Sequence, residues 1–304
     1  MILVVGATGL VGGMIARTLL NQRRPVRVLV REGRDYQALV DAGAEAALGD
    51  LKRPETLAAA CRGVDVVITT ASAGQRAAPD TPDTVDVAGN QNLVDAARAA
   101  GVKQFIYVSA LTATLDHPVP LPRAKARAEV MVRESGMAYT ILAANGIMDV
   151  MIPQVVTDRI RAGQPVTLVG EARRRHSFVA ARDIAAFAVA AVNHPAALHR
   201  RIAIGGPEAV SWRDIVAAHE RTLGRPVPVR WIAPGELLPD LPAIPGLTEL
   251  VSGLLAALET FDTPLDMAET SRTFGVTLTS LENFVTAAMQ PNDSYPAAGI
   301  ATRA

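Results

Sequence analysis

The chain has 304 residues, of which 49% are hydrophobic and 20% charged, a balance that excludes an intrinsically disordered protein and allows a large core. Thirty basic and thirty acidic residues cancel to a formal net charge of zero, which argues against nucleic acid or an anionic membrane as the partner. The single cysteine, Cys61, excludes an intramolecular disulfide and a cysteine-rich metal site, and predicts a reducing, cytoplasmic location. Because no apolar run reaches the ~20 residues of a membrane span and no basic segment precedes one at the N-terminus, we expect neither a span nor a signal peptide.

The first two thirds of the chain repeat one unit, in which a short apolar run is followed by a turn and a helical pattern. The predicted strands are Ile2–Val5, Val26–Val30, Ala44–Leu48, Asp65–Thr69, Gln104–Ser109 and Tyr139–Ala143. The predicted helices are Gly12–Asn21, Pro54–Arg62, Thr84–Ala100 and Pro122–Ser135. Strands that are apolar almost throughout are typical of a sheet buried on both faces. The alternation therefore predicts an α/β fold with a doubly wound parallel sheet.

After about residue 150 this repeat gives way to isolated helices and short strands. Capping residues predict three helices: Asp183 before Ile184–Val192, Ser211 with Asp214 before Trp212–Leu223, and Thr279 with Glu282 before Phe284–Met289. Thr263 with Pro264 is expected to start another helix. Six prolines between Pro226 and Pro245 predict an irregular, stiff connection that belongs to a small lid.

The sharpest local motif is Gly6-Ala-Thr-Gly-Leu-Val-Gly12, directly between the first strand and the first helix. Gly6 permits a tight turn, Gly9 lets backbone N–H groups approach a pyrophosphate, and Gly12 lets the helix lie close to the strand. The positive end of the helix would then hold the anion. The turn as a whole is predicted to bind the cofactor through Gly6, Thr8, Gly9, Leu10, Val11 and Gly12. A glycine-rich packing corner without a ligand is the alternative.

The end of the second strand carries Arg31, with Arg34 close behind, at the place where a carboxylate would bind the ribose of NAD. Because a guanidinium favours the 2′-phosphate, NADP(H) is the predicted cofactor. NAD(H) remains the alternative, since Glu32 would repel that phosphate if its side chain pointed inward. A solvated charge cluster would explain the same residues without a ligand.

With Asp50 and Leu51 after the third strand and Thr69-Thr70-Ala71 after the fourth, the chain resembles the atypical short-chain dehydrogenase/reductases, specifically the NmrA-like branch, over roughly residues 1 to 290. Further matching segments are Val85–Leu93, Gln104–Ala110, Lys125, Tyr139–Leu142, His176–Ala185, Gly205–Pro207 and Ser211-Trp212. The resemblance implies a Rossmann-type fold with a small C-terminal α/β lid subdomain. The expected parts are an NAD(P)-binding domain over 1–150 with returning segments near 176–206, a substrate-binding subdomain over 151–290 and a flexible tail over 291–304.

The resemblance also implies roles for individual residues. Asp50 and Leu51 would contact the adenine, Thr70, Ala71 and Ser72 the ribose and phosphate region, and Ser109 and Lys125 the nicotinamide end as catalytic residues; Asn145 would bind the carboxamide or the substrate. The carboxyl ends of parallel strands are where ligands bind in such sheets. The alternatives are a turn residue for Asp50, a strand-end hydroxyl bonded to its own backbone for Ser109, and a turn-forming Asn-Gly pair for Asn145.

The chain departs from the catalytic branch of the superfamily at Leu121, because that branch has its proton-donating tyrosine four positions before the lysine. Lys125, His117 or solvent would then supply the proton, and His176 would meet a substrate anion or lie in a solvated basic turn. A quinone relaxes the requirement, because hydride addition gives a stabilised oxyanion. We therefore expect an NADPH-dependent reductase of a small quinone-like or carbonyl electrophile, monomeric or homodimeric and without a metal. A non-catalytic NADP(H)-sensing regulator is the alternative, and a sugar-nucleotide epimerase ranks last.

Overall fold

The computed structural model describes residues 1–74, 79–239 and 247–290. The chain forms two compact units. Unit 1 contains Met1–Ala144, Ala181–Ile204 and Thr270–Val276, and unit 2 contains Asn145–Ala180, Gly205–Glu269 and the chain from Thr277 onward. The predicted tail over 291–304 lies outside the described residues.

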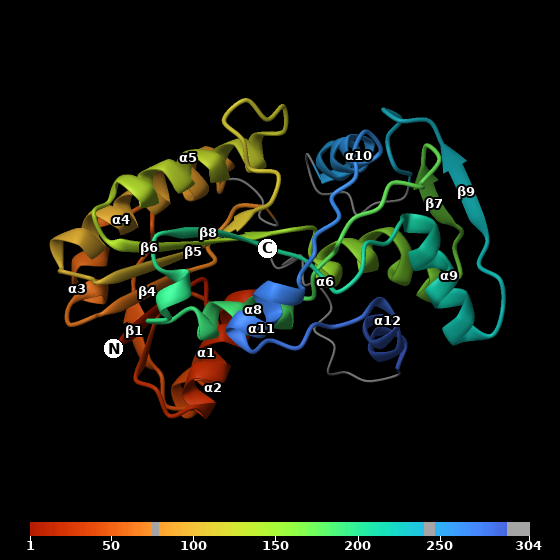
Figure 1. Ribbon diagram of the computed structural model, residues 1–304. Helices are drawn as coiled ribbons and strands as arrows, with labels where there is room; N and C mark the ends of the chain where they lie inside the picture. Colours follow the sequence, from red (N-terminus) through yellow and green to blue (C-terminus); the bar gives the residue numbers. More distant parts are fainter. Residues whose placement is uncertain (75–78, 240–246, 291–304) are drawn as a thin grey trace. The chain divides into compact units, whose positions relative to one another are not determined.

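Unit 1 is built on a seven-stranded sheet in the order β3-β2-β1-β4-β5-β6-β8, and every neighbouring pair is parallel (Figure 1). Its strands are β1 (Ile2–Val5), β2 (Val26–Val30), β3 (Glu45–Leu48), β4 (Val66–Thr69), β5 (Gln104–Ala110), β6 (Ala138–Ala144) and β8 (Arg200–Ile204). Strands β1 and β4 are buried along their whole length, as expected for a sheet covered on both faces. The predicted α/β fold with a doubly wound parallel sheet is confirmed.

Helices cover the sheet on both faces (Figure 1). On one face α1 (Leu10–Asn21) packs against α8 (Ala181–Ala190), and on the other lie α3 (Leu57–Cys61), α4 (Asn90–Ala99) and α5 (Pro120–Glu134). The core on the second face joins strand residues such as Phe105 and Tyr107 to Leu57, Leu93 and Val132 of these helices. Shorter elements are α2 (Gln37–Asp41), the 3₁₀ turns Pro54–Thr56 and Pro195–Ala197, and the π-helical segment η2 (Pro82–Gly89), which continues into α4.

The chain reverses its direction across the sheet next to β1. It runs outward from β1 through β2 to β3, and then crosses to β4 on the other side of β1. In open α/β sheets, a crevice forms at the carboxyl ends of the strands where the winding direction changes. This topology directs attention to the residues that follow β1 and β4.

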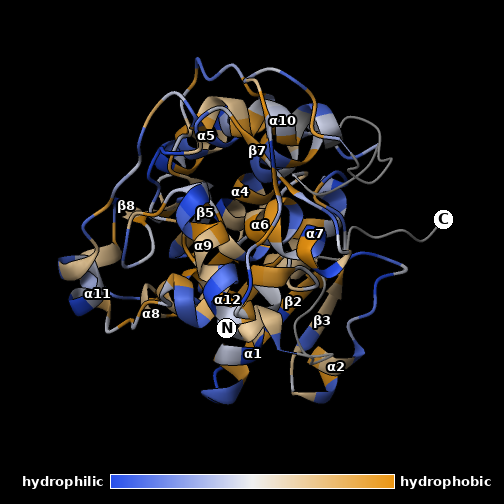
Figure 2. Cartoon of the chain, turned by 90° about the vertical axis from the view of Figure 1, so that its right-hand side faces the viewer, coloured by the Kyte–Doolittle hydropathy of each residue, from blue (hydrophilic) through white to orange (hydrophobic). Residues whose placement is uncertain are grey.

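Unit 2 combines a two-stranded parallel sheet with helices. The strands are β7 (Val166–Val169) and β9 (Val229–Ile232), and the helices are α6 (Met148–Ile152), the π-helical η3 (Pro153–Thr157), α7 (Asp158–Arg161), α9 (Trp212–Leu223), α10 (Leu247–Leu258) and α12 (Leu281–Met289). Its core gathers large apolar side chains that include Phe178, Trp212 and Phe284. The orange colour of α6 in Figure 2 marks its hydrophobic residues, of which Met148 and Ile152 belong to this core. Helix α11 (Ala268–Phe274) is divided between the two units.

The structure confirms some of the predicted helix ends and corrects others. Ser211 and Asp214 form the predicted capping box of α9. The helix expected after Asp183 already begins at Ala181, so Asp183 lies in its first turn rather than at the cap. Ser280, and not Thr279, caps α12.

Two expectations for the C-terminal third are wrong for reasons of tertiary pairing. Thr263 does not start a helix, because it pairs with His176 in an isolated parallel β-bridge, and α11 begins only at Ala268. The proline-rich window over residues 226–245 contains β9, although residues 240–245 of that window lie outside the described part.

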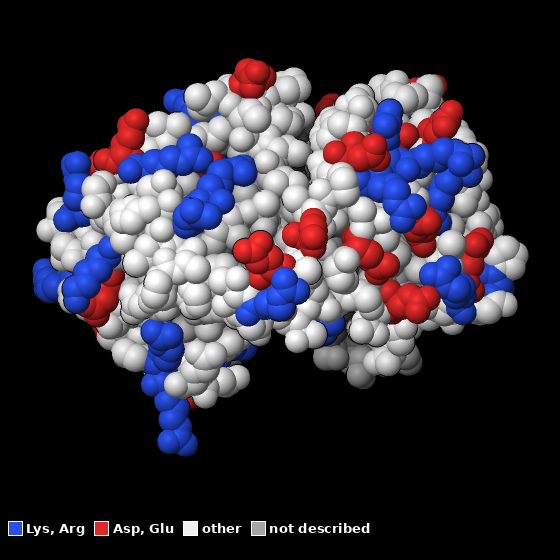
Figure 3. All heavy atoms as spheres, viewed as in Figure 1, with Lys and Arg blue, Asp and Glu red and all other residues white. Residues whose placement is uncertain are grey.

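Two general features of the surface bear on function. On the face shown in Figure 3, basic and acidic side chains are interspersed. Several charged side chains of the protein form ion pairs, such as Arg174 with Asp262. Within the described ranges, no helix is both long and apolar enough to span a bilayer.

Candidate active site

The turn between β1 and α1 depends on very close backbone approaches. Gly6 has a φ of +86°, and its carbonyl accepts a hydrogen bond from the Gly9 N–H at 2.9 Å. A Cβ at Gly12 would lie 2.2 Å from the Gly6 oxygen, and a Cβ at Gly6 would lie 2.6 Å from Thr70 Oγ1. Both glycines are therefore required by the fold itself.

Gly9 has no such structural requirement. Its backbone is extended, with φ −93° and ψ 174°, and a Cβ there would meet only the Gly6 oxygen, at 3.3 Å. Among the described residues no side chain caps α1, and its first turn holds no acidic residue. The N–H groups at this helix start carry partial positive charge and suit an anion that approaches the backbone closely at Gly9.

A recess of ≈ 440 Å³, part of it open to solvent, lies beside this turn at the carboxyl ends of the first four strands. Its lining includes these predicted cofactor-binding residues: Gly6, Thr8, Arg31, Asp50, Leu51 and Ala71. Val5, Leu29, Gly49 and Val85 complete it. Its donor set, with an uncapped helix start and a guanidinium, fits the adenosine and phosphates of a dinucleotide.

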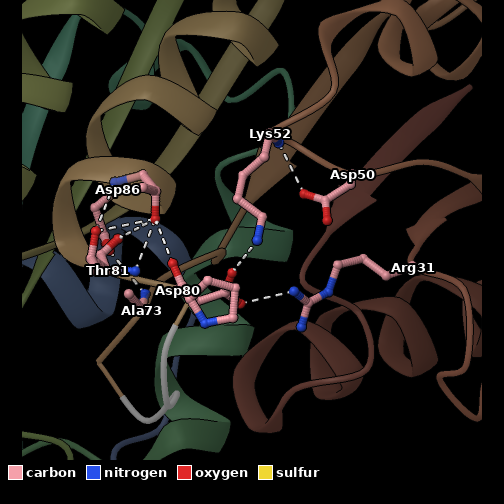
Figure 4. Close-up of polar contacts among 9 residues, drawn as sticks. Arg31, Asp50, Lys52, Ala73, Asp80, Thr81 and Asp86 are labelled. Atoms are coloured by element: carbon pink, nitrogen blue, oxygen red, sulfur yellow. Dashed lines mark hydrogen bonds and ion pairs between the residues drawn. The ribbon is translucent and has the colours of Figure 1, made fainter.

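Arg31 does not point into bulk solvent as part of a loose charge cluster. Its Nη1 donates to Asp80 Oδ2 at 2.8 Å, and Lys52 Nζ donates to Asp80 Oδ1 at 2.6 Å (Figure 4). Asp50 Oδ1 accepts from the Lys52 backbone N–H at 2.9 Å, so Asp50 also serves as the turn residue that the alternative interpretation predicted. The side chains of Glu32 and Arg34, by contrast, are exposed.

Thr70 and Ser72, the two other residues predicted to bind the cofactor after β4, form hydrogen bonds with the backbone. The Thr70 hydroxyl donates to the Val5 carbonyl at 3.3 Å and so ties the ends of β1 and β4 together. Ser72 Oγ accepts from the Gly74 N–H at 3.2 Å. Leu10 and Val11 lie in the first turn of α1, where their backbone N–H groups face the same end of the helix.

Lys125 lies on α5 and reaches toward a buried carboxylate. Its Nζ is 3.5 Å from Asp86 Oδ1, donates to the Val108 carbonyl at 3.4 Å, and lies 5.5 Å from the ring centre of Tyr107. Asp86 Oδ2 accepts from the Ala73 N–H at 2.9 Å, which fixes the carboxylate. Burial, with the negative charges of Asp86 and Glu129, raises the pKa of Tyr107 well above its usual value, so this phenol stays protonated.

The side chain of Ser109 belongs to a second buried polar cluster. Its Oγ donates to Glu129 Oε1 at 2.6 Å, which excludes the alternative of a hydroxyl bonded only to its own backbone. Glu129 also accepts from Arg133 Nη2 at 2.7 Å and from Arg201 Nε at 2.9 Å. Ser109 follows Tyr107 by two positions on β5, so both side chains lie on the face covered by α5.

The candidates for the proton donor have different surroundings. Leu121 is half-buried in the first turn of α5, and a Cβ at Gly74 would lie 2.8 Å from its Cδ2. His117 is half-buried, and its Nδ1 accepts from the Val119 N–H at 3.0 Å, which leaves Nε2 to carry the proton of the neutral ring. Within the described ranges, no group of three or more His, Cys, Asp or Glu side chains could hold a metal ion.

Asn145 and His176 belong to unit 2, where they share a hydrogen-bond network with Thr263. The Asn145 amide donates to the Thr263 carbonyl at 3.1 Å, and its Oδ1 accepts from the Gly146 N–H at 2.9 Å. His176 is buried, with Nε2 3.1 Å from the Leu258 carbonyl and Nδ1 2.8 Å from Thr263 Oγ1. Both expectations for His176, a substrate contact and a solvated turn, are therefore wrong, because the imidazole is a structural partner in the core of unit 2.

Several charged residues at the site escaped the sequence analysis: Lys52, Asp80, Asp86 and Glu129. Two of them had a recognisable signal. Asp86 is a carboxylate within the otherwise largely apolar run that opens the segment Val85–Leu93, and Glu129 follows Lys125 by four positions on one helix. Lys52 and Asp80 become significant only through their contact, which no local pattern predicts.

Comparison with known proteins places the chain among dinucleotide-dependent enzymes and their relatives. The model of the NmrA-like family matches residues 1–285. The NAD(P)H azoreductase of Xenophilus azovorans is 35% identical over 235 residues, which cover 77% of each chain. A photosystem II assembly factor of Guillardia theta is 31% identical over 294 residues, 93% of this chain and 92% of that protein.

Solved structures show the same fold at lower identity. The NADPH-dependent quinone oxidoreductase of Escherichia coli, complexed with NADPH, superposes with a TM-score of 0.80 at 22% identity, over 95% of this chain and 100% of that one. The triphenylmethane reductase of Citrobacter sp., complexed with NADP(H), gives a TM-score of 0.81 at 21% identity, with the same coverage.

Proposed function

The chain belongs to the NmrA-like family, and from that premise we propose that it is an NADPH-dependent reductase of a small electrophile, either quinone-like or an activated carbonyl compound. The observation that carries the proposal is the recess beside the uncapped start of α1, with Arg31 in its lining. The azoreductase relative and the two reductases of the same fold support it, because their names specify NAD(P)H or NADP(H) and reduction of small molecules.

The residues present suit the parts of the cofactor. The backbone from Gly6 to Gly12 would bind the diphosphate, Asp50 and Leu51 the adenosine, and Arg31 the 2′-phosphate. When bound, NADPH supplies a hydride. Lys125 would keep a positive charge near the negative charge that develops on the substrate, held in place by Asp86.

The protonation step follows from the hydrogen bonds of the same region. Ser109 directs its only proton to Glu129, so toward a ligand its oxygen acts as an acceptor rather than as an acid. Leu121 lies one turn before Lys125, at the position where the catalytic branch has its tyrosine, and its side chain has no acidic proton to donate. A substrate whose reduced form is a stabilised oxyanion needs no strong acid, since water can protonate it, and this favours quinones over simple ketones.

The test is turnover with purified protein. When the protein is mixed with NADPH and each quinone of a panel, the absorbance of NADPH at its nicotinamide band should fall. Lys125→Met should slow this reaction by about tenfold or more. Lys103→Met is the matched control, because Lys103 is exposed and pairs with Asp65, directly before β4. Absence of turnover across the panel would refute the reductase, and equal rates for the two variants would refute the role of Lys125.

A second candidate is a protein that binds NADP(H) without chemistry and changes its contact with a partner protein. The relative from Guillardia theta supports it, because it is named as an assembly factor and matches nearly the whole chain. This candidate predicts NADPH binding without oxidation and a partner affinity that differs between NADP⁺ and NADPH. Measured turnover with any quinone would favour the reductase instead.

The expected partners and location follow from the same proposal. A small-molecule substrate is the expected partner, since the relatives named as reductases act on small molecules, and the chain is expected to be a monomer or a homodimer. A cytoplasmic location is supported by the single cysteine, whose thiol is buried and reduced.

A further inference from the structure

Asp80 lies between two cations, Arg31 in the lining of the recess and Lys52 directly after its lining residues Asp50 and Leu51. Each oxygen of its carboxylate accepts from a different one: Arg31 follows β2, and Lys52 follows β3 (Figure 4). The Asp80 side chain is only 7% exposed, whereas those of Arg31 and Lys52 are 26% and 29% exposed. The carboxylate is therefore the buried member of the group, and its partners border solvent.

The backbone around Asp80 holds this carboxylate in place. The next residue, Thr81, begins η2 with a capping box, in which its N–H donates to Thr84 Oγ1 at 2.9 Å and its own Oγ1 accepts from the Thr84 N–H at 3.2 Å. Asp80 is thus set directly before a fixed helix start, with its side chain directed toward Arg31 and Lys52.

Within the described part of the chain, the Asp80 carboxylate, with one negative charge, pairs with two cations. A phosphate monoester carries close to two negative charges and three acceptor oxygens at neutral pH, so it would match these two cations more fully. Arg31 also lines the recess that would hold the adenosine. An anion that enters from the recess would therefore compete with Asp80 for the same donors.

We propose that Arg31 and Lys52 together form the subsite for the 2′-phosphate, and that Asp80 is an internal competitor that occupies their donors in the cofactor-free protein. The inference rests on the proposed function and extends it: Asp80 limits how strongly NADPH is preferred over NADH. Lys52 is the second phosphate ligand, which the sequence did not reveal.

The two possible roles of Asp80 give opposite results when the charge is removed. If Asp80 is a competitor, removal of its charge frees both cations and strengthens the binding of a 2′-phosphate. If Asp80 only positions Arg31 and Lys52, removal of its charge weakens that binding. Nucleotides without the 2′-phosphate are indifferent to the change in either case.

The experiment compares 2′,5′-ADP with ADP by calorimetry on the full chain. Asp80→Asn should tighten 2′,5′-ADP by about five- to tenfold and leave ADP unchanged, whereas Lys52→Gln should weaken 2′,5′-ADP by about tenfold and leave ADP unchanged. Asp83→Asn is the matched control, because Asp83 lies on the same segment but pairs at the surface with Arg127.

The outcomes separate this inference from the proposed function. If Asp80→Asn binds 2′,5′-ADP more weakly than the wild type or equally well, Asp80 is not a competitor. If Lys52→Gln binds 2′,5′-ADP with unchanged affinity, Lys52 is not a ligand of the 2′-phosphate. Should Asp80→Asn fail to fold, the Lys52→Gln result still decides the subsite. If the wild-type chain binds neither nucleotide, the proposed function itself fails.

Discussion

The hydroxyl of Ser109 at the end of β5 donates to the carboxylate of Glu129 on α5 across 2.6 Å, and both side chains are buried. Glu129 in turn accepts from Arg133 and Arg201, so one carboxylate joins the helix to two strands of the sheet. The arrangement fixes the orientation of Ser109 and determines that its oxygen meets a ligand as an acceptor.

Replacing Glu129 by Gln should lower the free energy of unfolding by about 1–3 kcal/mol, because two guanidinium groups and a hydroxyl lose a charged acceptor. The cost stays moderate since Arg133 and Arg201 are partly exposed and can rehydrate. Urea unfolding measures it. Glu134→Gln, at an exposed position of the same helix, is the control, and an equal midpoint for the two variants would contradict the account.

Gly9→Ala and Gly12→Ala should separate ligand binding from folding. At Gly9 the added methyl group meets little besides the Gly6 oxygen, so the fold should remain while NADPH affinity falls by about tenfold or more. At Gly12 the methyl group would lie 2.2 Å from that oxygen, and we expect a loss of about 2 kcal/mol or more of stability. Thermal unfolding and NADPH titration of both variants give the answer; normal NADPH affinity in Gly9→Ala would argue against the phosphate-binding role.

Acidification should destabilise the protein through two buried histidines. His219 Nε2 lies 2.9 Å from Thr157 Oγ1 and Nδ1 lies 2.8 Å from the Ile215 carbonyl, and burial lowers the pKa of both His176 and His219 below the ordinary 6.5. Because the unfolded chain then binds more protons than the folded one, their contribution to stability is complete above about pH 6.5 and is lost as the pH falls below it.

The measurement is the midpoint of urea unfolding, determined at several pH values between pH 8 and pH 5. The midpoint should fall with pH in the wild type, and the decrease should be smaller in His219→Gln relative to its own value at pH 8. His194→Gln is the control, because that side chain is half-buried rather than buried and accepts from the Ala196 N–H at the start of a 3₁₀ turn. A midpoint independent of pH in this window would rule out the proposed cause.

Cys61 should be inert in the folded protein. It is fully buried, and burial raises the pKa of its thiol to about 11 in spite of the nearby charge of Arg27. At pH 8 only about one thiol in a thousand is then ionised, and none is accessible. A disulfide reagent should therefore label no thiol in the native chain and one in guanidinium chloride. Rapid labelling without denaturant would show that α3 opens readily.

Six of the seven strands of the sheet could be predicted from the sequence because each is a short apolar run bounded by turn residues. The exception is β8, which begins with two exposed arginines and is not among the predicted strands. The segment before α4 could not be predicted either. The sequence predicts one α-helix from Thr84 to Ala100, but Pro82–Gly89 is π-helical, and the side-chain amide of Asn90 donates to the Val85 and Asp86 carbonyls at 3.3 Å and 3.0 Å. The spacing of apolar residues predicts that a helix forms, but it does not distinguish a π-helical from an α-helical turn.

The same limit applies to the candidate site. Gly6 and Gly12 are recognisable because the turn requires glycine there, and Gly9 and Arg31 are recognisable from their positions in the glycine motif and directly after β2. The partner of Arg31 is Asp80, 49 positions away, and that of Ser109 is Glu129, 20 positions away. Such pairs are set by which strand ends and helices the tertiary fold brings together, so the charge balance of the site emerges only from the structure.

The binding of NADPH tests the central claim most directly. Titration of the purified chain with NADPH in a calorimeter should give one site per chain with a dissociation constant in the micromolar range or below, and Gly9→Ala should weaken it. Absence of any heat of binding with NADPH or NADH at millimolar concentration would contradict the account.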